Sequence, residues 1–307
     1  MTHKGILFIG DPHVASRVPG FRCDDYPDVV LDKLAWCMDY AQQEELRTAI
    51  LGDLFHFPRD NANRLLARLI DILSGQCPLA IYGNHDVHEN QLTMDDSLSV
   101  VAASGAIQLL EPGSPWQGEI GGRKVVIGGT SWGLKMPTEY VQQDSLVFWM
   151  THHDLKVPGY EEHGRIRPQP LAGIDAVING HIHRRLETVQ AESTSWFTPG
   201  NIARVSRGDA TRDHVPSVLR VDIDSAGWMP AWVEVPHLHF EKVFHAAVLE
   251  DEEDVGESTF VRGLAELKAR RTESGAGLRQ FLDDNLPKYE QDVQDEINQL
   301  ADEVFEK

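Results

Sequence analysis

Short apolar runs alternate along the chain with segments in which apolar residues recur every three or four positions. The runs have the length of buried strands, so we expect strands at residues 6–9, 48–51, 79–82, 146–150 and 176–178. Helical spacing of apolar residues predicts helices around residues 31–41 and 65–73. Further strands are expected at residues 124–127, 218–223 and 232–235, the last two joined as a hairpin through residues 224–227. This alternation is typical of a layered α/β fold.

Each of the first five runs is followed by a short polar motif. In chain order the motifs are Asp11-Pro12-His13, Gly52-Asp53, Gly83-Asn84-His85-Asp86, His152-His153 and Gly180-His181-Ile182-His183. Open α/β sheets hold their ligands at the carboxyl ends of the strands, so we expect the motifs to meet at one sheet edge. One such motif alone is more often a turn or a core histidine, but all five in order predict a metal centre.

The residue types in these motifs suit a pair of divalent metal ions. Two ions about 3.5–4 Å apart can clamp the attacking and leaving oxygens of a phosphoester, and a bridging carboxylate offsets their repulsion. Asp53 is the candidate bridge. The other expected ligands are Asp11, His13 and His183 for one ion, and Asn84, His152 and His181 for the second. Imidazole, carboxylate and amide ligands without thiolate suit manganese, iron or zinc better than copper(I) or an iron–sulfur cluster. We expect manganese, with iron, zinc or magnesium as alternatives.

Two residues beside the expected ligands are candidates for the chemistry itself. His85 follows a ligand directly and is placed to protonate the leaving oxygen or to stabilise the pentacovalent phosphorus. We expect Asp86 to hold the tautomer of His85. Arg59 and Arg184 are candidates for substrate contacts, although ordinary surface arginines are as common. The motifs therefore predict a two-metal phosphoester hydrolase.

At these residues the chain resembles a calcineurin-like metallophosphoesterase, and among those enzymes it is most similar to the SbcD/Mre-type DNA repair nucleases. The segment Gly52-Asp53-Leu54-Phe55-His56, followed by Arg59, carries the nuclease resemblance together with residues 96–105 and 198–201. It covers about residues 1–240 and implies two facing β-sheets flanked by helices. It also implies a ligand directly after the fourth strand, hence His152 before His153. For His56 it implies a substrate-side role, with a hydrogen bond behind the metal ligands as the alternative.

The resemblance implies a manganese-dependent DNA exonuclease or endonuclease of repair or recombination. One alternative is a hydrolase of small nucleotide diesters or phosphomonoesters on the same fold, and another is a non-catalytic scaffold. The formal net charge of −20 opposes DNA binding and favours the small esters, whereas the segment 52–56 favours the nuclease. The complete ligand set argues against the scaffold. Trp132 and Trp196 could stack a base, although buried tryptophans are commoner.

The composition changes near residue 250, where a run of acidic residues begins. Residues 241–307 hold 18 acidic against 8 basic residues, and their apolar spacing predicts two helices separated by Pro287. We expect a phosphoesterase domain at 1–240 and a short, acidic, mostly helical extension at 241–307. In the resembling family, C-terminal helices bind an SMC-like ATPase of the SbcC type, and helices between the first motifs pair two subunits.

Targeting signals and cysteines bear on where the protein works. The apolar run at the start of the chain is too short for the core of a signal peptide. No apolar stretch approaches the length of a membrane span. The three cysteines are widely spaced, which disfavours disulfides and thiolate metal sites. We therefore expect a cytoplasmic protein that makes no membrane contact.

Overall fold

The computed structural model describes residues 3–244, except 20, 90, 112, 141, 143 and 208, together with residue 294. Residues 1–246 form one compact unit. In the described part of the chain no helix combines the length and the apolar character that a membrane crossing requires. Beyond residue 244 the predicted acidic extension lies outside the described residues, except for residue 294. Its helices, its partner and the domain boundary at residue 240 stay predictions.

The first sheet contains six strands in the order β12-β11-β1-β2-β3-β4. Its strands are β1 (Gly5–Ile9), β2 (Leu46–Ile50), β3 (Leu79–Ala80), β4 (Gln108–Leu109), β11 (Ser217–Asp224) and β12 (Gly227–Glu234). The strands from β1 to β4 are parallel, whereas β11 and β12 form an antiparallel hairpin beside β1. The carboxyl ends of β1, β2 and β3 therefore lie at the same edge.

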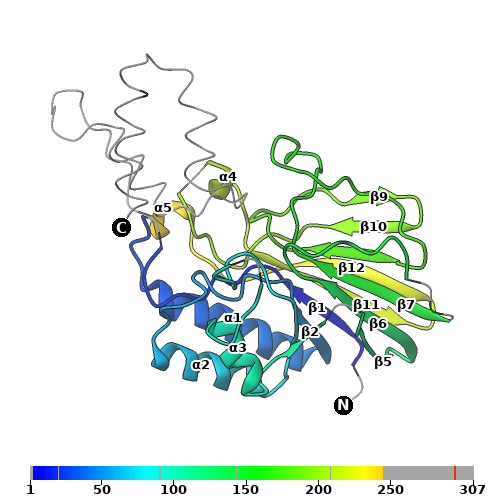
Figure 1. The fold of residues 1–307 in the computed structure, drawn as a ribbon, viewed down its shortest axis with the longest axis horizontal. Helices are drawn as coiled ribbons and strands as arrows, with labels where there is room; N and C mark the ends of the chain where they lie inside the picture. Colours follow the sequence, from blue (N-terminus) through cyan, green and yellow to red (C-terminus); the bar gives the residue numbers. More distant parts are fainter. Residues whose placement is uncertain are drawn as a thin grey trace. The chain divides into compact units, whose positions relative to one another are not determined.

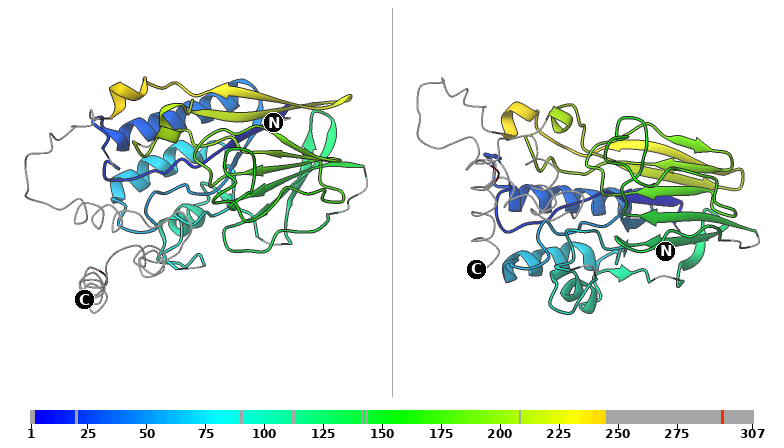
Figure 2. Two further views of the ribbon diagram at one scale, coloured as in Figure 1. Left: turned by 90° about the horizontal axis from the view of Figure 1, so that it is seen from above. Right: turned by 45° about the horizontal axis from the view of Figure 1, so that its top comes forward.

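The second sheet also contains six strands, in the order β5-β6-β7-β8-β10-β9. Its strands are β5 (Trp116–Ile120), β6 (Arg123–Thr130), β7 (Ser145–Thr151), β8 (Ala176–Asn179), β9 (Val189–Ala191) and β10 (Thr194–Phe197). The central strands β6, β7, β8 and β10 are parallel. Figure 1 shows this sheet stacked against the first one, and Figure 2 shows the same layers from two further sides.

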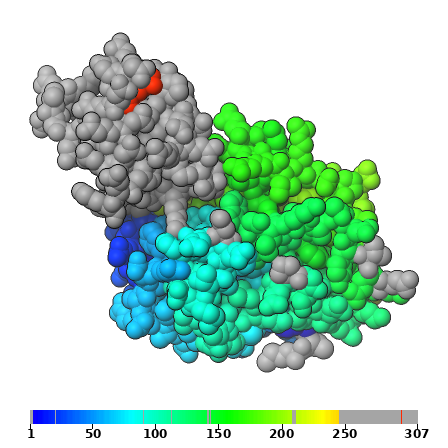
Figure 3. All heavy atoms as spheres, viewed as in Figure 1, coloured from blue at the N-terminus to red at the C-terminus, as the bar shows by residue number. Residues whose placement is uncertain are grey.

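The two sheets enclose one apolar core, and helices cover the other face of the first sheet. The core between the sheets includes Phe8, Leu51, Phe148 and Ile178, none of which is more than 1% exposed. The helices are α1 (Tyr26–Gln43), α2 (Asn63–Ser74) and α3 (Ser97–Ala103), with two short ones, α4 (Asp209–Arg212) and α5 (Phe240–Val243), further along. The predicted fold of two facing sheets flanked by helices is confirmed. In Figure 3 the cyan stretch around α2 and α3 lies directly beside the green residues of the second sheet.

The structure corrects several predicted element boundaries. Helix α1 begins at Tyr26, ahead of the apolar stripe, with Pro27 in the first turn, where a proline costs no hydrogen bond. The hairpin is present, but β12 starts at Gly227 because its pairing with β11 runs up to the turn. Strand β3 ends at Ala80 rather than at residue 82, because the Tyr82 N–H donates to Ser131 Oγ instead of to a strand.

Candidate metal centre

The five polar motifs follow the carboxyl ends of β1, β2, β3, β7 and β8. Two hydrogen bonds join the sheets at this point. The His181 backbone N–H donates to Asp11 Oδ1 at 3.1 Å, and the His152 ring donates through Nδ1 to the Leu51 carbonyl oxygen at 2.8 Å. Residues that are 170 positions apart in sequence therefore share one edge of the stacked sheets.

The backbone is unusual at the sharp turns where the strands end. Four of the expected ligands have positive φ angles: Asp11 (36°), His13 (52°), Asp53 (47°) and His181 (72°). Such angles cost a non-glycine residue about 1 kcal/mol or more, and they persist where the surrounding structure holds them. Gly83 has room only for hydrogen, since a Cβ there would lie 2.6 Å from His152 Nε2. The turns therefore give up local stability to aim polar groups at one point.

One group of aimed side chains contains Asp53, His152 and His181. His152 Nε2 lies 3.2 Å from Asp53 Oδ2 and 3.3 Å from Asn84 Oδ1, and Asn84 Oδ1 lies 2.9 Å from His181 Nδ1. The ring and carboxylate atoms of the group fall within 4.8 Å of one another, close enough to hold one cation. With Asn84, these are the bridge and the three ligands predicted for one ion.

The tautomers of the two histidines in this group are fixed from behind. His152 Nδ1 faces the Leu51 carbonyl oxygen at 2.8 Å, and His181 Nε2 faces Asp154 Oδ1 at 2.8 Å. A carbonyl and a carboxylate accept hydrogen bonds, so each of these ring nitrogens carries the proton. In a neutral imidazole the other nitrogen is then a bare lone pair. These two nitrogens face the oxygens of Asn84 and Asp53. In their neutral form they complete a donor set that suits a divalent cation.

A second group contains His13, Asp53 and His183. His13 Nε2 lies 2.8 Å from His183 Nε2 and 3.7 Å from Asp53 Oδ2. Asp11 is fully buried, and its Oδ2 has no hydrogen-bond partner among the described residues. A buried carboxylate oxygen without a partner is costly unless a cation meets it. His13, Asp53 and His183 therefore also fit a divalent ion, and Asp53 is common to both groups. The unpartnered Asp11 oxygen agrees with a nearby cation, and Asp11 as a ligand of this ion stays a prediction.

The charges of the buried groups agree with this fit. Burial raises the pKa of Asp11 to about 7, because its negative charge lacks solvent and is repelled by Asp53. Burial opposes ionisation of Asp53 as well, but the neighbouring His152 and His85 keep its pKa well below the ordinary value. Burial alone would lower the pKa of His152, but Asp53 and Asp11 raise it to about 9, so without a metal ion His152 carries a proton that a bound cation would displace. Burial also lowers the pKa of His183 to about 3 and that of His13 well below 6.5. Both imidazoles are thus neutral, the form in which histidine binds metal.

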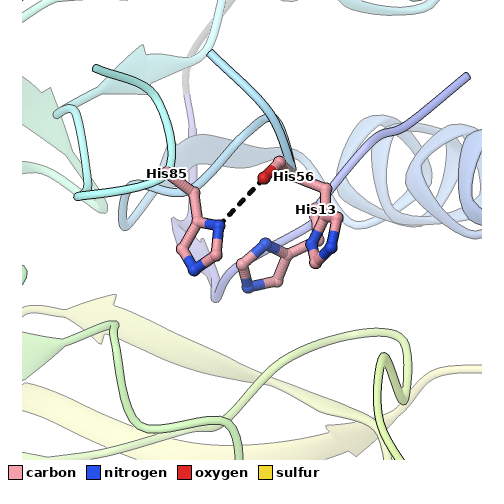
Figure 4. A group of neighbouring side chains, drawn as sticks. All are labelled: His13, His56 and His85. Carbon is pink, nitrogen blue, oxygen red and sulfur yellow. Dashed lines mark hydrogen bonds between the residues drawn. The ribbon is translucent and has the colours of Figure 1, made fainter. Parts of the chain in front are cut away.

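His13 also forms a third group with His56 and His85, whose ring nitrogens lie within 4.8 Å of one another. Figure 4 shows these three side chains. His85 Nδ1 lies 2.9 Å from the His56 carbonyl oxygen, and the His85 backbone N–H donates to Asp53 Oδ1 at 2.8 Å. The carbonyl places the ring proton on Nδ1 and leaves Nε2 as the basic nitrogen. The His56 ring stacks on His85 with centroids 5.4 Å apart, and burial lowers the pKa of His56 to about 3.

The prediction that Asp86 holds the tautomer of His85 is wrong. The Asp86 carboxylate accepts hydrogen bonds from the backbone N–H groups of Phe55 (2.9 Å), Gly83 (2.9 Å) and Leu54 (3.3 Å). It therefore ties the loop after β2 to the loop after β3. The chain turns between His85 and Asp86, so two adjacent residues point to different partners.

Both candidate substrate arginines make contacts within the protein. Arg59 donates to Asp96 Oδ1 at 3.0 Å and to Thr93 Oγ1 at 3.4 Å, which fixes the loop before α2 to the start of α3. Arg184 donates to the Gly159 carbonyl oxygen. These contacts engage part of each guanidinium group, and a role in substrate binding stays a prediction.

Two residues that the motif pattern did not assign complete the surroundings of His181. Asp154, only 6% exposed, accepts the hydrogen bond from His181 Nε2 and orients that ring. Carboxylates behind metal-binding histidines set both tautomer and orientation. The half-buried Trp132 has its ring centroid 4.8 Å from that of His181, whereas Trp196 is buried and donates to the Gln169 carbonyl. A lone aspartate two residues after a histidine has no recognisable pattern.

The structure gives His152 and His153 different surroundings. His153 turns away from Asp53, with Nδ1 2.5 Å from Thr151 Oγ1 and Nε2 2.8 Å from the Leu134 carbonyl oxygen. We expect His152→Ala to lose the metal ion held with Asn84. His153→Ala should keep full metal content but lose about 1–3 kcal/mol of stability, because it leaves a buried partner unsatisfied.

Metal content per chain and thermal unfolding of the two purified variants measure these effects. The exposed His163→Ala serves as the control, since the same substitution there removes neither a candidate ligand nor a buried side chain. If only the His153 variant lost metal, the ligand would be His153 instead of His152.

A comparison with protein families agrees with this geometry. A family model described as calcineurin-like phosphoesterase matches residues 5–185, more than half of the chain. No protein with a curated description matches the sequence. A hypothetical protein from Thermus thermophilus is 15% identical, covering 76% of this chain and 100% of its own, with a TM-score of 0.45.

Two further solved structures have lower scores. A predicted phosphoesterase from Streptococcus pneumoniae is 13% identical over 76% of this chain and 91% of its own, with a TM-score of 0.36. A single mutant of Vps29 from Entamoeba histolytica is 16% identical over 76% and 99%, with a TM-score of 0.32. Identities this low do not indicate a shared activity.

Proposed function

The chain belongs to the calcineurin-like phosphoesterase family, and from this premise we propose that it is a two-metal phosphodiesterase that cleaves DNA. The observation that carries the proposal is the convergence of two groups of metal-binding side chains on Asp53. In one of these groups, contacts at His152 Nδ1 and His181 Nε2 direct the other ring nitrogen of each histidine toward the oxygens of Asn84 and Asp53. A scaffold without catalytic activity would not need four strained ligands and an oriented donor set.

The residues of this chain have separable tasks in the proposed reaction. Divalent ions, when bound, supply polarisation of the phosphoryl oxygens and a water that loses its proton near neutral pH. Asp53 contributes the negative charge that both ion sites share. His85 holds its Nδ1 proton against the His56 carbonyl, so its Nε2 can hold and deliver a proton to the leaving oxygen. Asp154 and Leu51 keep the ligand histidines oriented.

Two features support DNA as the substrate over a small ester. The segment Gly52-Asp53-Leu54-Phe55-His56 resembles the SbcD/Mre-type nucleases, and in the structure it supplies both Asp53 and the carbonyl that orients His85. The half-buried Trp132 indole beside His181 is a surface on which a base could stack. The net charge of −20 favours the alternative, a hydrolase of small nucleotide esters.

The net negative charge of the protein also bears on its binding partners. Because residues 241–307 carry half of the excess negative charge, we propose that a partner helps to bring DNA to the site. An SMC-like ATPase of the SbcC type, bound through this extension, and pairing of two chains are the arrangements that the family resemblance suggests. Manganese is the proposed metal because the ligand set mixes imidazole with oxygen.

Cleavage assays on single-stranded DNA, double-stranded DNA and a panel of small nucleotide esters test the substrate class. We expect Mn²⁺-dependent cleavage of DNA that disappears on chelation. The Asp53→Asn variant, purified in parallel, is the control for contaminating nucleases. Cleavage is also compared between low and higher salt, because salt screens the repulsion between an acidic protein and DNA, which is therefore strongest at low salt.

The outcomes separate the alternatives. Metal-dependent hydrolysis of the small esters with no cleavage of either DNA would replace the nuclease by the small-ester hydrolase. A folded, metal-loaded protein without activity on any substrate would favour the scaffold.

A further inference from the structure

A cavity of about 480 Å³ is lined by residues that take no part in the metal centre. One wall of the cavity is α1, and the others come from α5 and from the segments around Arg204 and Pro236. Figure 1 shows α5 near one end of α1. Half of the lining residues are apolar: Val29, Trp36, Pro216, Pro236, Leu238 and Val243. The size is ordinary for a small-molecule pocket, which typically has about 300–1,000 Å³.

Three basic side chains line this apolar cavity, and all are buried. Arg22 and Arg204 are 6% exposed, and Lys33 is 9% exposed. Lys33 Nζ donates to the Pro236 carbonyl at 2.9 Å, and Arg204 donates to the His214 and Leu238 carbonyls at 2.7–3.0 Å. These bonds use one of three N–H groups on Lys33 and three of five on Arg204, so both retain donors.

The carboxylates around the cavity, Asp24, Asp32 and Glu241, form an ion pair with only one of the three cations among the described residues. Arg22 is paired with Asp24, and Asp32 at the cavity is exposed to solvent. Within the described residues, Lys33 and Arg204 form no ion pair, and their acceptors are neutral carbonyls. Burial, helped by the charge of Arg22, lowers the pKa of Lys33 to about 8, so most molecules still carry the charge at pH 7. Buried charges without a counter-charge are costly and are normally paired.

We propose that this cavity binds an organic phosphate with a flat ring, of the size of a nucleoside monophosphate. Lys33 and Arg204 would meet the phosphate with their remaining N–H groups, because charge-assisted bonds to phosphate are among the strong ones. The ring would lie on the apolar wall that includes Trp36. This site is separate from the metal centre and goes beyond the proposed function, since it would bind a nucleotide without cleaving it.

Calorimetric titration of the full-length, metal-loaded protein with adenosine 5′-monophosphate tests the proposal. We expect one equivalent of binding that weakens at least about tenfold in Lys33→Met, which keeps the length of the side chain but removes its charge. Lys33→Arg should restore binding to within a few-fold. Lys242→Met, the same change at an exposed lysine on α5, should bind like the original protein.

Further arms separate this cavity from the metal centre. Asp53→Asn should retain the equivalent of nucleotide, and Lys33→Met should retain phosphoesterase activity, so failure of one site does not imply failure of the other. Adenosine should bind at least about tenfold more weakly, because it lacks the charge. Inorganic phosphate should also bind more weakly, because it lacks the ring. Unchanged nucleotide binding in Lys33→Met, or no binding outside the metal centre, would overturn the proposal and leave the cations as anchors for backbone carbonyls.

Discussion

Asp53→Asn is expected to remove both bound metal and activity, with turnover falling by at least about 10³-fold. A loss of this size corresponds to about 4 kcal/mol of transition-state stabilisation, the range that bound metal ions provide. The physical reason is the position of the carboxylate. Its Oδ2 lies 3.2 Å from His152 Nε2 and 3.7 Å from His13 Nε2, so it is shared by both groups of ligands. Asparagine keeps the shape but removes the charge that offsets repulsion between two cations.

Metal analysis beside steady-state kinetics measures this effect. The matched control is Asp60→Asn, which makes the same substitution at an exposed aspartate on the following loop, also with positive φ. It should keep two metal ions per chain and full turnover. Full metal content in Asp53→Asn would show that Asp53 is not the bridge.

The strand ends of the metal centre could be predicted because two physical regularities act together. Buried apolar runs mark strands, and parallel strands bring their carboxyl ends to one edge. Asp11 and His181 are far apart in sequence, yet the His181 N–H reaches the Asp11 carboxylate at 3.1 Å. The helical stripes are equally readable, because α1 and α2 each bury one face against the first sheet.

The direction of side chains in the loops could not be predicted in the same way. Asp86 adjoins His85 in sequence, but the turn between Gly83 and Asp86 sends its carboxylate to backbone N–H groups. Asp154 reaches His181 only because the loop after β7 lies beside the loop after β8. Positive φ angles at four non-glycine residues cannot be read from residue type, since their cost is met by tertiary contacts.

Short strands also escaped prediction. Strand β10 covers only Thr194–Phe197, and it is ordered by pairing with β8 on one side and β9 on the other. A four-residue run with one tryptophan and one phenylalanine carries little periodicity. Its structure depends on neighbours that the sequence brings there from elsewhere, and strand preference is largely a matter of such packing.

His85→Ala is expected to separate binding from chemistry, because it should keep both metal ions while turnover on DNA falls by about 10²–10⁴-fold. Among the described residues, the His85 ring forms no hydrogen bond with the Asp53 carboxylate. Its backbone N–H donates to Asp53, a bond that alanine preserves, whereas its Nδ1 is held by the His56 carbonyl. The substitution therefore removes a positioned proton donor and leaves the ligand groups in place.

A substrate with a different leaving group tests whether His85 acts as an acid. An ester that releases p-nitrophenolate needs no proton on its leaving oxygen, so the loss of activity in His85→Ala should be at least about tenfold smaller on it than on DNA. The control is His88→Ala, an exposed histidine three residues further along the same loop, which should match the original protein on both substrates. Equal losses on both substrates would assign His85 to stabilising the phosphorus centre instead. Loss of metal together with activity would contradict the role of His85 as an acid and would indicate that it helps to hold a metal ion, as a ligand or by supporting one.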